Sequence, residues 1–311
     1  MILTVTLNPA VDLTLEVDGW VLGEVNRAAS VAKVAGGKGI NVSRMLRDLG
    51  EVTTALTILG TDSVHEFQRL AREARCPIIY INIPGEVRTN IHLMDPSKPA
   101  SLKVNQPGVP VGESHLRHFM LLFQQQLKGA RLVCMGGSLP PGCPPDTYAQ
   151  LAALCAANNV PFLMDAAGEP LRQTLPHKPL IAKPNRRELE DTLNRRISTP
   201  REIYEGAREL QNLGARCAVV TDGDRPVLGV LDDEAWLAVP PKISPKGATG
   251  AGDSLAAGLV SGLQRGYTFP EALRLGVACG TACCLEDEHN LAAMANIDRL
   301  LGKVHLKPWK G

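Results

Sequence analysis

The sequence predicts an α/β fold of three layers, in which helices cover both faces of a mainly parallel sheet. Apolar runs of strand length alternate with longer helical patterns through most of the 311 residues. Two glycine clusters each open a helical pattern, and neither a repeat nor a low-complexity linker divides the chain. We therefore expect one domain over residues 1–311 with a single large core.

The expected strands are short apolar runs bounded by turn residues. They cover 2–7, 52–58, 131–135, 161–165, 179–183 and 217–221. The expected helices carry apolar residues at three-residue and four-residue spacing, such as Leu255, Leu259 and Leu263. They cover 40–49, 62–74, 113–127, 146–158, 186–193, 200–213, 252–265 and 269–285.

Two segments, at about 11–34 and 78–106, interrupt this alternation. The first contains an alternating run from Val11 to Val17, and the second contains the apolar runs 78–83 and 88–93. We expect short antiparallel strands that lie outside the main sheet and form a small β-sheet lid. Such a sheet cannot bury two faces alone. The lid should therefore cover a cleft and also pair with a second copy of the chain, which predicts a homodimer through the lid strands.

Charge and composition favour a protein that binds small molecules. The chain has 33 basic and 32 acidic residues, so its net charge of +1 gives no broad field for nucleic acid or an anionic membrane. No apolar run reaches the length of a membrane span, and the first residues do not resemble a signal peptide. The eight cysteines form no Cys-x-x-Cys pair. We therefore expect reduced thiols and a cytoplasmic location.

The segment from Ala248 to Ser254 places a carboxylate directly after small residues and at the start of a helix. Glycine permits a sharp turn and a close approach to a ligand, and the first helical turn presents unpaired N–H groups to an anion. Asp253 would then stand beside a docked phosphoryl group, where it could accept the proton of an attacking hydroxyl. The alternative is an acidic residue that only complements the helix dipole.

A second glycine cluster, Gly36 to Gly39, opens the helix at 40–49. Lys38 and Asn41 supply a cation and an amide, a combination suited to phosphate and sugar hydroxyls. Gly39 follows Lys38 where a P-loop needs Ser or Thr, and no dinucleotide-binding fingerprint occurs in the chain. These two differences exclude the commonest nucleotide-binding folds.

Asn185 and Glu188 lie one turn apart at the start of the helix at 186–193. That spacing suits a hydrated Mg²⁺, which usually takes few protein ligands. It equally suits a capping box, in which Asn185 caps the helix and Glu188 reaches back to it; from the residues alone we favour the cap.

The segment from Gly136 to Gly142 follows the strand at 131–135, at the edge where open α/β sheets bind ligands. Ser138 in this segment is a candidate contact to a substrate. The alternative is a tight loop whose Gly and Pro residues serve only the turn.

Together these motifs resemble the ribokinase-like carbohydrate kinases of the phosphofructokinase-B group over essentially the whole chain. The segments that carry the resemblance, in that family's order and spacing, are 6–12, 23–27, 35–42, 137–142, 183–190 and 249–254. Asn26-Arg27 and the run Gly37-Lys38-Gly39 are most similar to fructose-1-phosphate kinases and tagatose-6-phosphate kinases.

The resemblance implies a role for each candidate residue. Asp253 is implied to be the catalytic base, with an anion hole formed by the backbone N–H groups of Gly250, Ala251 and Gly252. The implied phosphosugar site consists of Asp12, Arg27, Gly36, Gly37, Lys38, Asn41, Arg88, Asn90 and Ser138. The implied ATP site consists of Lys183, Asn185, Glu188, Thr221 and Gly223, with Asn185 and Glu188 serving Mg²⁺ through water.

The resemblance also implies the reaction, which is ATP-dependent phosphorylation of a ketohexose monophosphate to its 1,6-bisphosphate. Fructose 1-phosphate is the first expectation, and tagatose 6-phosphate and fructose 6-phosphate are the alternatives. A hypothesis from another class is a catalytically silent sensor that binds phosphosugars. An intact Asp253 with its glycines weighs against a silent sensor, because a pure binder gains nothing from a base beside a phosphoryl site.

Overall fold

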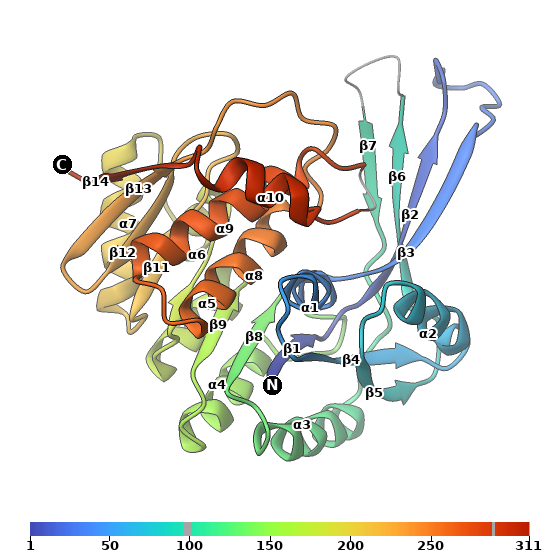
Figure 1. The fold of residues 1–311 in the computed structure, drawn as a ribbon. Helices are drawn as coiled ribbons and strands as arrows, with labels where there is room; N and C mark the ends of the chain where they lie inside the picture. Colours follow the sequence, from blue (N-terminus) through green and yellow to red (C-terminus); the bar gives the residue numbers. More distant parts are fainter. Residues whose placement is uncertain (96–100, 288–289, 311) are drawn as a thin grey trace.

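The central sheet places strands of distant sequence side by side (Figure 1). The computed structural model describes residues 1–95, 101–287 and 290–310. The ten strands of this sheet lie in the order β14-β13-β12-β11-β10-β9-β8-β1-β4-β5. Their bounds are β1 Ile2–Thr6, β4 Thr53–Gly60, β5 Ile78–Ile83, β8 Leu132–Gly136, β9 Phe162–Asp165, β10 Ile181–Ala182, β11 Cys217–Val220, β12 Val227–Leu231, β13 Glu234–Val239 and β14 His305–Pro308. From β5 to β11 neighbouring strands are parallel, and β12, β13 and β14 add an antiparallel edge.

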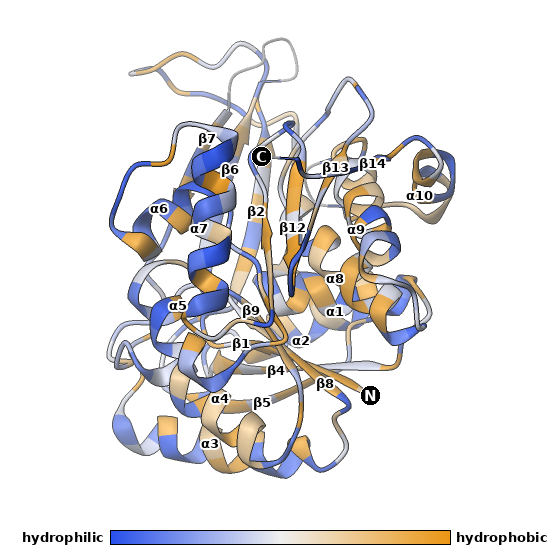
Figure 2. Ribbon diagram, turned by 90° about the vertical axis from the view of Figure 1, so that its left-hand side faces the viewer, coloured by the Kyte–Doolittle hydropathy of each residue, from blue (hydrophilic) through white to orange (hydrophobic). Residues whose placement is uncertain are grey.

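Helices cover both faces of this sheet, which confirms the predicted three layers. One face packs against α3 Glu113–Leu127, α4 Thr147–Ala157, α5 Gly168–Thr174, α6 Arg186–Leu193 and α7 Pro200–Asn212, and a short 3-10 turn, Leu175–His177, follows α5. The other packs against α1 Lys38–Asp48, α2 Val64–Glu73, α8 Ala251–Gln264, α9 Phe269–Cys283 and α10 Met294–Leu301. In β1, Leu3 and Val5 face the first set of helices and Ile2 faces the second, as the alternation of side chains along a strand requires. Figure 2 shows the apolar central strands beneath the hydrophilic outer side of α7.

Close packing of α8 against α9 fixes the position of the helix that follows the Gly250 turn. A Cβ atom on Gly258 would lie 2.9 Å from the Cα atom of Gly276, so only glycine permits this approach. Ala256, Ala257 and Leu259 of α8 are completely buried. None of the described helices is long and apolar enough to cross a membrane.

The lid is a separate four-stranded sheet in the order β3-β2-β6-β7. Its strands are β2 Ala10–Glu16, β3 Ser30–Gly36, β6 Arg88–Met94 and β7 Ser101–Asn105. Residues 96–100 of the predicted lid lie outside the described residues. Figure 1 shows this sheet standing beside the main sheet, over the end of α1.

Two details of the predicted lid are wrong. The run 78–83 is β5, which extends the main sheet by pairing in parallel with β4 and buries Ile81 and Ile83 in the core. An apolar run of strand length does not specify which sheet it joins, and here α2 returns the chain beside β4. The lid is also not wholly antiparallel, because β2 pairs with β6 in parallel. Both strands leave the main sheet from its carboxyl edge, so they enter the lid in the same direction.

Candidate active site

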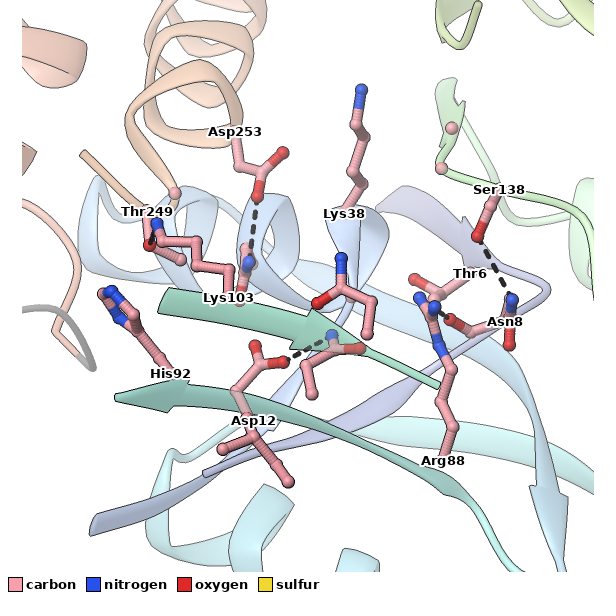
Figure 3. Close-up of a pocket in the computed structure, with 18 of the residues that line it drawn as sticks. Thr6, Asn8, Asp12, Lys38, Arg88, His92, Lys103, Ser138, Thr249 and Asp253 are labelled. Atoms are coloured by element: carbon pink, nitrogen blue, oxygen red, sulfur yellow. Dashed lines mark hydrogen bonds between the residues drawn. The ribbon is translucent and has the colours of Figure 1, made fainter. Parts of the chain in front are cut away.

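A cavity of about 290 Å³ lies between the lid and the carboxyl ends of β1 and β8 (Figure 3). The core contributes Thr6, Asn8, Gly37, Lys38, Asn41, Gly136, Gly137, Ser138, Thr249, Gly250 and Asp253. The lid contributes Asp12, Thr14, Arg88, Asn90, Ile91, His92, Lys103 and Asn105. The cavity therefore occupies the edge where open α/β sheets bind ligands, and the lid forms its second wall.

Asp253 lies at the inner wall of the cavity, in the first turn of α8. Gly250, the residue that caps this helix, has a φ of 78°, a left-handed conformation that glycine adopts without strain. Asp253 is only 8% exposed, and its Oδ2 atom accepts a hydrogen bond of 2.8 Å from Nδ2 of Asn41. Burial, and next the negative charge of Asp165, raise the pKa of Asp253 to about 6, against the lowering effect of Lys38, Asn41 and Lys183. A carboxylate with this pKa is ionised at neutral pH and still basic enough to accept a proton.

Two lysines converge on the buried carboxylate of Asp165. Nζ of Lys38 lies 2.5 Å from Oδ1 of Asp165, and Nζ of Lys183 lies 2.8 Å from Oδ2. Burial raises the pKa of Asp165, but the two ammonium groups outweigh that effect and hold its pKa below the ordinary value. Lys38 also contacts Oε1 of Glu188 at 3.1 Å. Its ammonium thus pairs with these two carboxylates, and Figure 3 shows it directed away from Asp12 and Arg88.

Lys183 reaches the start of α8 although it does not line the cavity. A Cβ atom on Gly252 would lie 3.6 Å from Nζ of Lys183, so this ammonium adjoins the turn formed by Gly250, Ala251 and Gly252. The unpaired N–H groups of a helix start and a neighbouring cation together favour an anion. The sequence prediction of an anion site at this turn remains a proposal that this geometry supports.

Asn185 and Glu188 form the capping box that the residues favoured. Oδ1 of Asn185 accepts from the Glu188 N–H at 3.0 Å, and Oε2 of Glu188 accepts from the Asn185 N–H at 2.8 Å. No group of three or more His, Cys, Asp or Glu side chains in the described ranges is arranged to hold a metal ion directly. The side-chain oxygens of Asn185 and Glu188 fit a hydrated Mg²⁺ held through water, because each oxygen can accept a second hydrogen bond from a water molecule.

The inner face of the lid presents polar side chains in cross-strand rows. Asp12 of β2 lies opposite Asn90 of β6, and Nδ2 of Asn90 donates to Oδ1 of Asp12 at 2.8 Å. Burial raises the pKa of Asp12, although the bond from Asn90 and the charge of Arg88 oppose the change. A Cβ atom on Gly36 would lie 1.9 Å from Oδ2 of Asp12, so glycine is required there for the carboxylate to keep its position.

The structure brings together most of the residues that the sequence indicated, but not all of them. Arg27 lies in the exposed segment between β2 and β3 and does not line the described cavity. Thr221 and Gly223 also lie outside it, after β11, where Thr221 forms a parallel bridge with Asn185. Their predicted contacts with substrate or ATP remain proposals.

Sequence reasoning missed several residues of the site. The missed residues are Thr6, Asn8, Thr14, Ile91, His92, Lys103, Asn105, Asp165 and Thr249. Asp165 is the last residue of β9. Like Ser138 after β8, it therefore lies at the carboxyl edge of the sheet, where open α/β sheets bind ligands. Thr14 and His92 follow Asp12 and Asn90 by two residues, the spacing that returns a side chain to the same face of a strand. Pairing of His92 with Lys103 depends on the lid register, which the sequence does not reveal.

Comparisons with known proteins agree with this geometry. Residues 5–293 match the pfkB family of carbohydrate kinases. The chain is 35% identical over 289 residues to the 1-phosphofructokinase of Xanthomonas campestris, covering 91% of each protein. It is 31% identical to the 1-phosphofructokinase of Bacillus subtilis, covering 93% of this chain and 94% of that protein. Phosphofructokinase-2 of Escherichia coli in complex with fructose-6-phosphate superposes with a TM-score of 0.88 at 26% identity, covering 97% of this chain and 98% of that one. The chain therefore belongs to the pfkB family of carbohydrate kinases.

Proposed function

We propose that this carbohydrate kinase transfers the terminal phosphoryl group of ATP to the free primary hydroxyl of fructose 1-phosphate, which gives fructose 1,6-bisphosphate and ADP. The observation that carries the proposal is the position of Asp253. Its carboxylate lies at the start of α8 and faces the same cavity as the polar inner side of the lid. The relatives named 1-phosphofructokinase support fructose 1-phosphate as the acceptor.

Each group of the site has a part in this transfer. Asp253 accepts the hydroxyl proton as the sugar oxygen forms its bond to phosphorus, and the bond from phosphorus to the bridging oxygen of ADP breaks. The backbone N–H groups of Gly250, Ala251 and Gly252, with Lys183 beside them, stabilise charge on the phosphoryl oxygens. Arg88 holds the phosphate that the sugar already carries, and Asp12 and Asn90 bind its hydroxyls.

Mg²⁺ supplies charge neutralisation for the ATP phosphates when it is bound. Asn185 and Glu188 would hold it through water, from the side of the cavity where Lys38 meets Glu188. Lys38 then has a positioning role here, because its pairing with Asp165 and Glu188 fixes both carboxylates. Burial lowers the pKa of Lys38, but these two carboxylates and Asp253 outweigh it and raise the pKa, so the ammonium stays charged.

The direct test is a screen of purified protein with ATP and Mg²⁺ against fructose 1-phosphate, fructose 6-phosphate, tagatose 6-phosphate and unphosphorylated fructose. ADP release is followed at several sugar concentrations, and kcat/KM is compared because discrimination between isomers lies in the transition state. The highest kcat/KM is expected for fructose 1-phosphate. A higher value for either 6-phosphate would change the assigned sugar, and sugar binding without ADP release would indicate a sensor.

The pH dependence of the reaction should report the ionisation of Asp253. Because the pKa of Asp253 is raised to about 6, the base form is present above that pH and is lost as the pH falls through it. We expect kcat/KM to fall about tenfold for each pH unit below about 6. The measurement is kcat/KM between pH 5 and pH 8, with binding of the sugar measured at each pH as the control. A flat profile across this range would contradict the assignment of Asp253 as the base.

The proposal includes a homodimer through the lid. Its outer face carries exposed apolar side chains, including Val31 at 60%, Leu102 at 49% and Val104 at 48% exposure. Lys103 and Asn105, which alternate with Leu102 and Val104 along β7, line the cavity, so Leu102 and Val104 point the other way. Exposed apolar side chains on an edge strand favour pairing with another copy.

The dimer is checked by light scattering of the eluting protein. Val104→Glu should shift the mass toward the monomer, because a carboxylate on the outer face opposes burial. The control is Val52→Glu, at a side chain that is 71% exposed and lies directly before β4 of the main sheet, outside the lid strands. A wild-type mass of one chain at assay concentration would remove the dimer from the proposal.

A further inference from the structure

Four chain segments join the lid to the core, and they meet at one place. They are 7–9, 36–37, 84–87 and 106–112, which connect the lid strands to β1, α1, β5 and α3. We call them the lid joint. A Cβ atom on Gly37 would lie 3.4 Å from the Cα atom of Pro9, so the second segment packs directly on the first. Any movement of the lid relative to the core must pass through these contacts.

The side chain of Arg88, at the start of β6, binds two other segments of the lid joint. Its Nη2 and Nε atoms donate to the carbonyl oxygens of Asn8 at 3.1 Å and Pro9 at 3.4 Å. Nη1 donates to the carbonyl oxygen of Gln106 at 3.1 Å. The next residue, Thr89, donates its N–H to Oε1 of Gln106 at 2.7 Å. Arg88 thus connects three of the four segments and at the same time lines the cavity.

The side chain of Asn8 completes this network. Nδ2 of Asn8 donates to the carbonyl oxygen of Pro107 at 3.0 Å and to Oγ of Ser138 at 3.1 Å. Asn8 is 6% exposed, and a Cβ atom on Gly108 would lie 2.2 Å from its Oδ1 atom. The amide therefore links the segment 106–112, which leaves the lid after β7, to the loop after β8 that contains Ser138. Figure 3 shows the bond to Ser138 as a dashed line.

The lid joint is a mechanical connection and not a second ligand site. A cavity of about 10 Å³ lies under it, lined by apolar side chains such as Leu7, Val87 and Val109. A volume of this size holds no more than about one water molecule. Arg88 also lines the main cavity, so a ligand bound there can contact the joint directly.

We propose that Asn8 is a positioning residue that couples occupancy of the sugar site to the position of the lid, together with Arg88. A guanidinium group has five N–H donors, and three of them take the carbonyl acceptors found among the described residues. Two donors serve an anion in the cavity while the joint stays connected. A phosphate bound by Arg88 thereby holds the segments of the joint together. Asn8 in turn fixes Ser138 relative to these segments through its hydrogen bond to Oγ. This inference rests on the proposed function.

The test compares Asn8→Ala with wild type in two measurements. The first is the ratio of ATP hydrolysis without sugar to phosphorylation of fructose 1-phosphate. We expect this ratio to rise about tenfold, with a similar rise in the KM for the sugar, because two hydrogen bonds of the joint are lost and water enters under the lid. The second is hydrogen exchange with fructose 1-phosphate alone, which should protect residues 84–90 and 104–108 in wild type but not in the variant.

Matched variants separate positioning from a general loss of structure. Asn158→Ala removes an exposed side-chain hydrogen bond to the carbonyl oxygen of Leu154 on α4, far from the cavity, and should leave the ratio unchanged.

A second pair of variants tests the joint if Asn8→Ala does not fold. Gln106→Ala removes the acceptor for the Thr89 N–H from an exposed position and should loosen the joint, whereas Gln106→Glu keeps an acceptor there. An unchanged ratio and unchanged exchange in both Asn8→Ala and Gln106→Ala would overturn the inference. If wild type transfers no phosphoryl group, the proposed function fails, while hydrogen exchange with the sugar phosphate still decides the coupling.

Discussion

Asp253→Asn is expected to lower kcat by about 10²–10⁴-fold, because the amide cannot accept the hydroxyl proton. Binding of the sugar phosphate should change little, since the lid residues that hold it are untouched. The measurement is steady-state kcat beside the dissociation constant of the sugar from calorimetry. Asp298→Asn, at an exposed position on α10, is the matched control and should keep full activity. Equal activity in Asp253→Asn would refute the assignment of the base.

The same variant should be more stable than wild type at neutral pH. The pKa of Asp253 rises from 3.8 to about 6 on folding, so the folded state binds more protons between these values. Wild-type stability therefore falls as the pH rises from about 4 through 6, and the ionised carboxylate costs up to roughly 3 kcal/mol above that range. Asparagine avoids this cost and still has an amide group that can bind Asn41. Urea unfolding of both proteins at pH 4.5 and pH 7.5 checks the prediction, and a gain equal at both pH values would contradict it.

Asp165→Asn is expected to destabilise the fold by about 3–5 kcal/mol and to abolish most activity. Lys183 is 3% exposed, and this change leaves its ammonium buried without the carboxylate that faces it. Lys38 keeps Glu188 but loses its shorter contact. Thermal unfolding should show a fall in Tm of at least about 5 °C.

A second substitution separates the two effects of Asp165→Asn. Adding Lys183→Met removes the buried charge, so the double variant should recover much of the lost Tm while activity stays low. Glu113→Gln serves as the control, because it breaks a surface ion pair with Arg117 and should leave both Tm and kcat unchanged. A double variant no more stable than Asp165→Asn would show that the loss does not arise from the unpaired lysine.

Local sequence patterns predicted the parallel part of the main sheet well, because strands buried on both faces read as apolar runs. The elements that were not predicted are α5, the 3-10 turn Leu175–His177, β12, β13, α10 and β14. β12 and β13 form an edge hairpin whose turn includes Asp232, with a φ of 49°, and β14 pairs with β13 through residues of which most are exposed. β13 and β14 bury little apolar surface, so their periodicity is weak, and antiparallel pairing is what holds them. β12 is buried between β11 and β13, but its apolar run is only five residues long and contains Gly229.

The sequence by itself determined the local chemistry. It showed a carboxylate after a glycine turn at the start of a helix, a lysine within the glycine cluster Gly36 to Gly39, and the capping box at Asn185 and Glu188. Each of these depends on residues within one turn of helix, where spacing alone fixes which groups are neighbours. Only the tertiary structure decided that Asp165 joins Lys38 to Lys183, that Asn41 binds Asp253, and that Asn8 ties Ser138 to the lid. Those pairs lie between 18 and 212 positions apart along the chain, and the order of the strands in the sheet, which no local pattern encodes, brings them into contact.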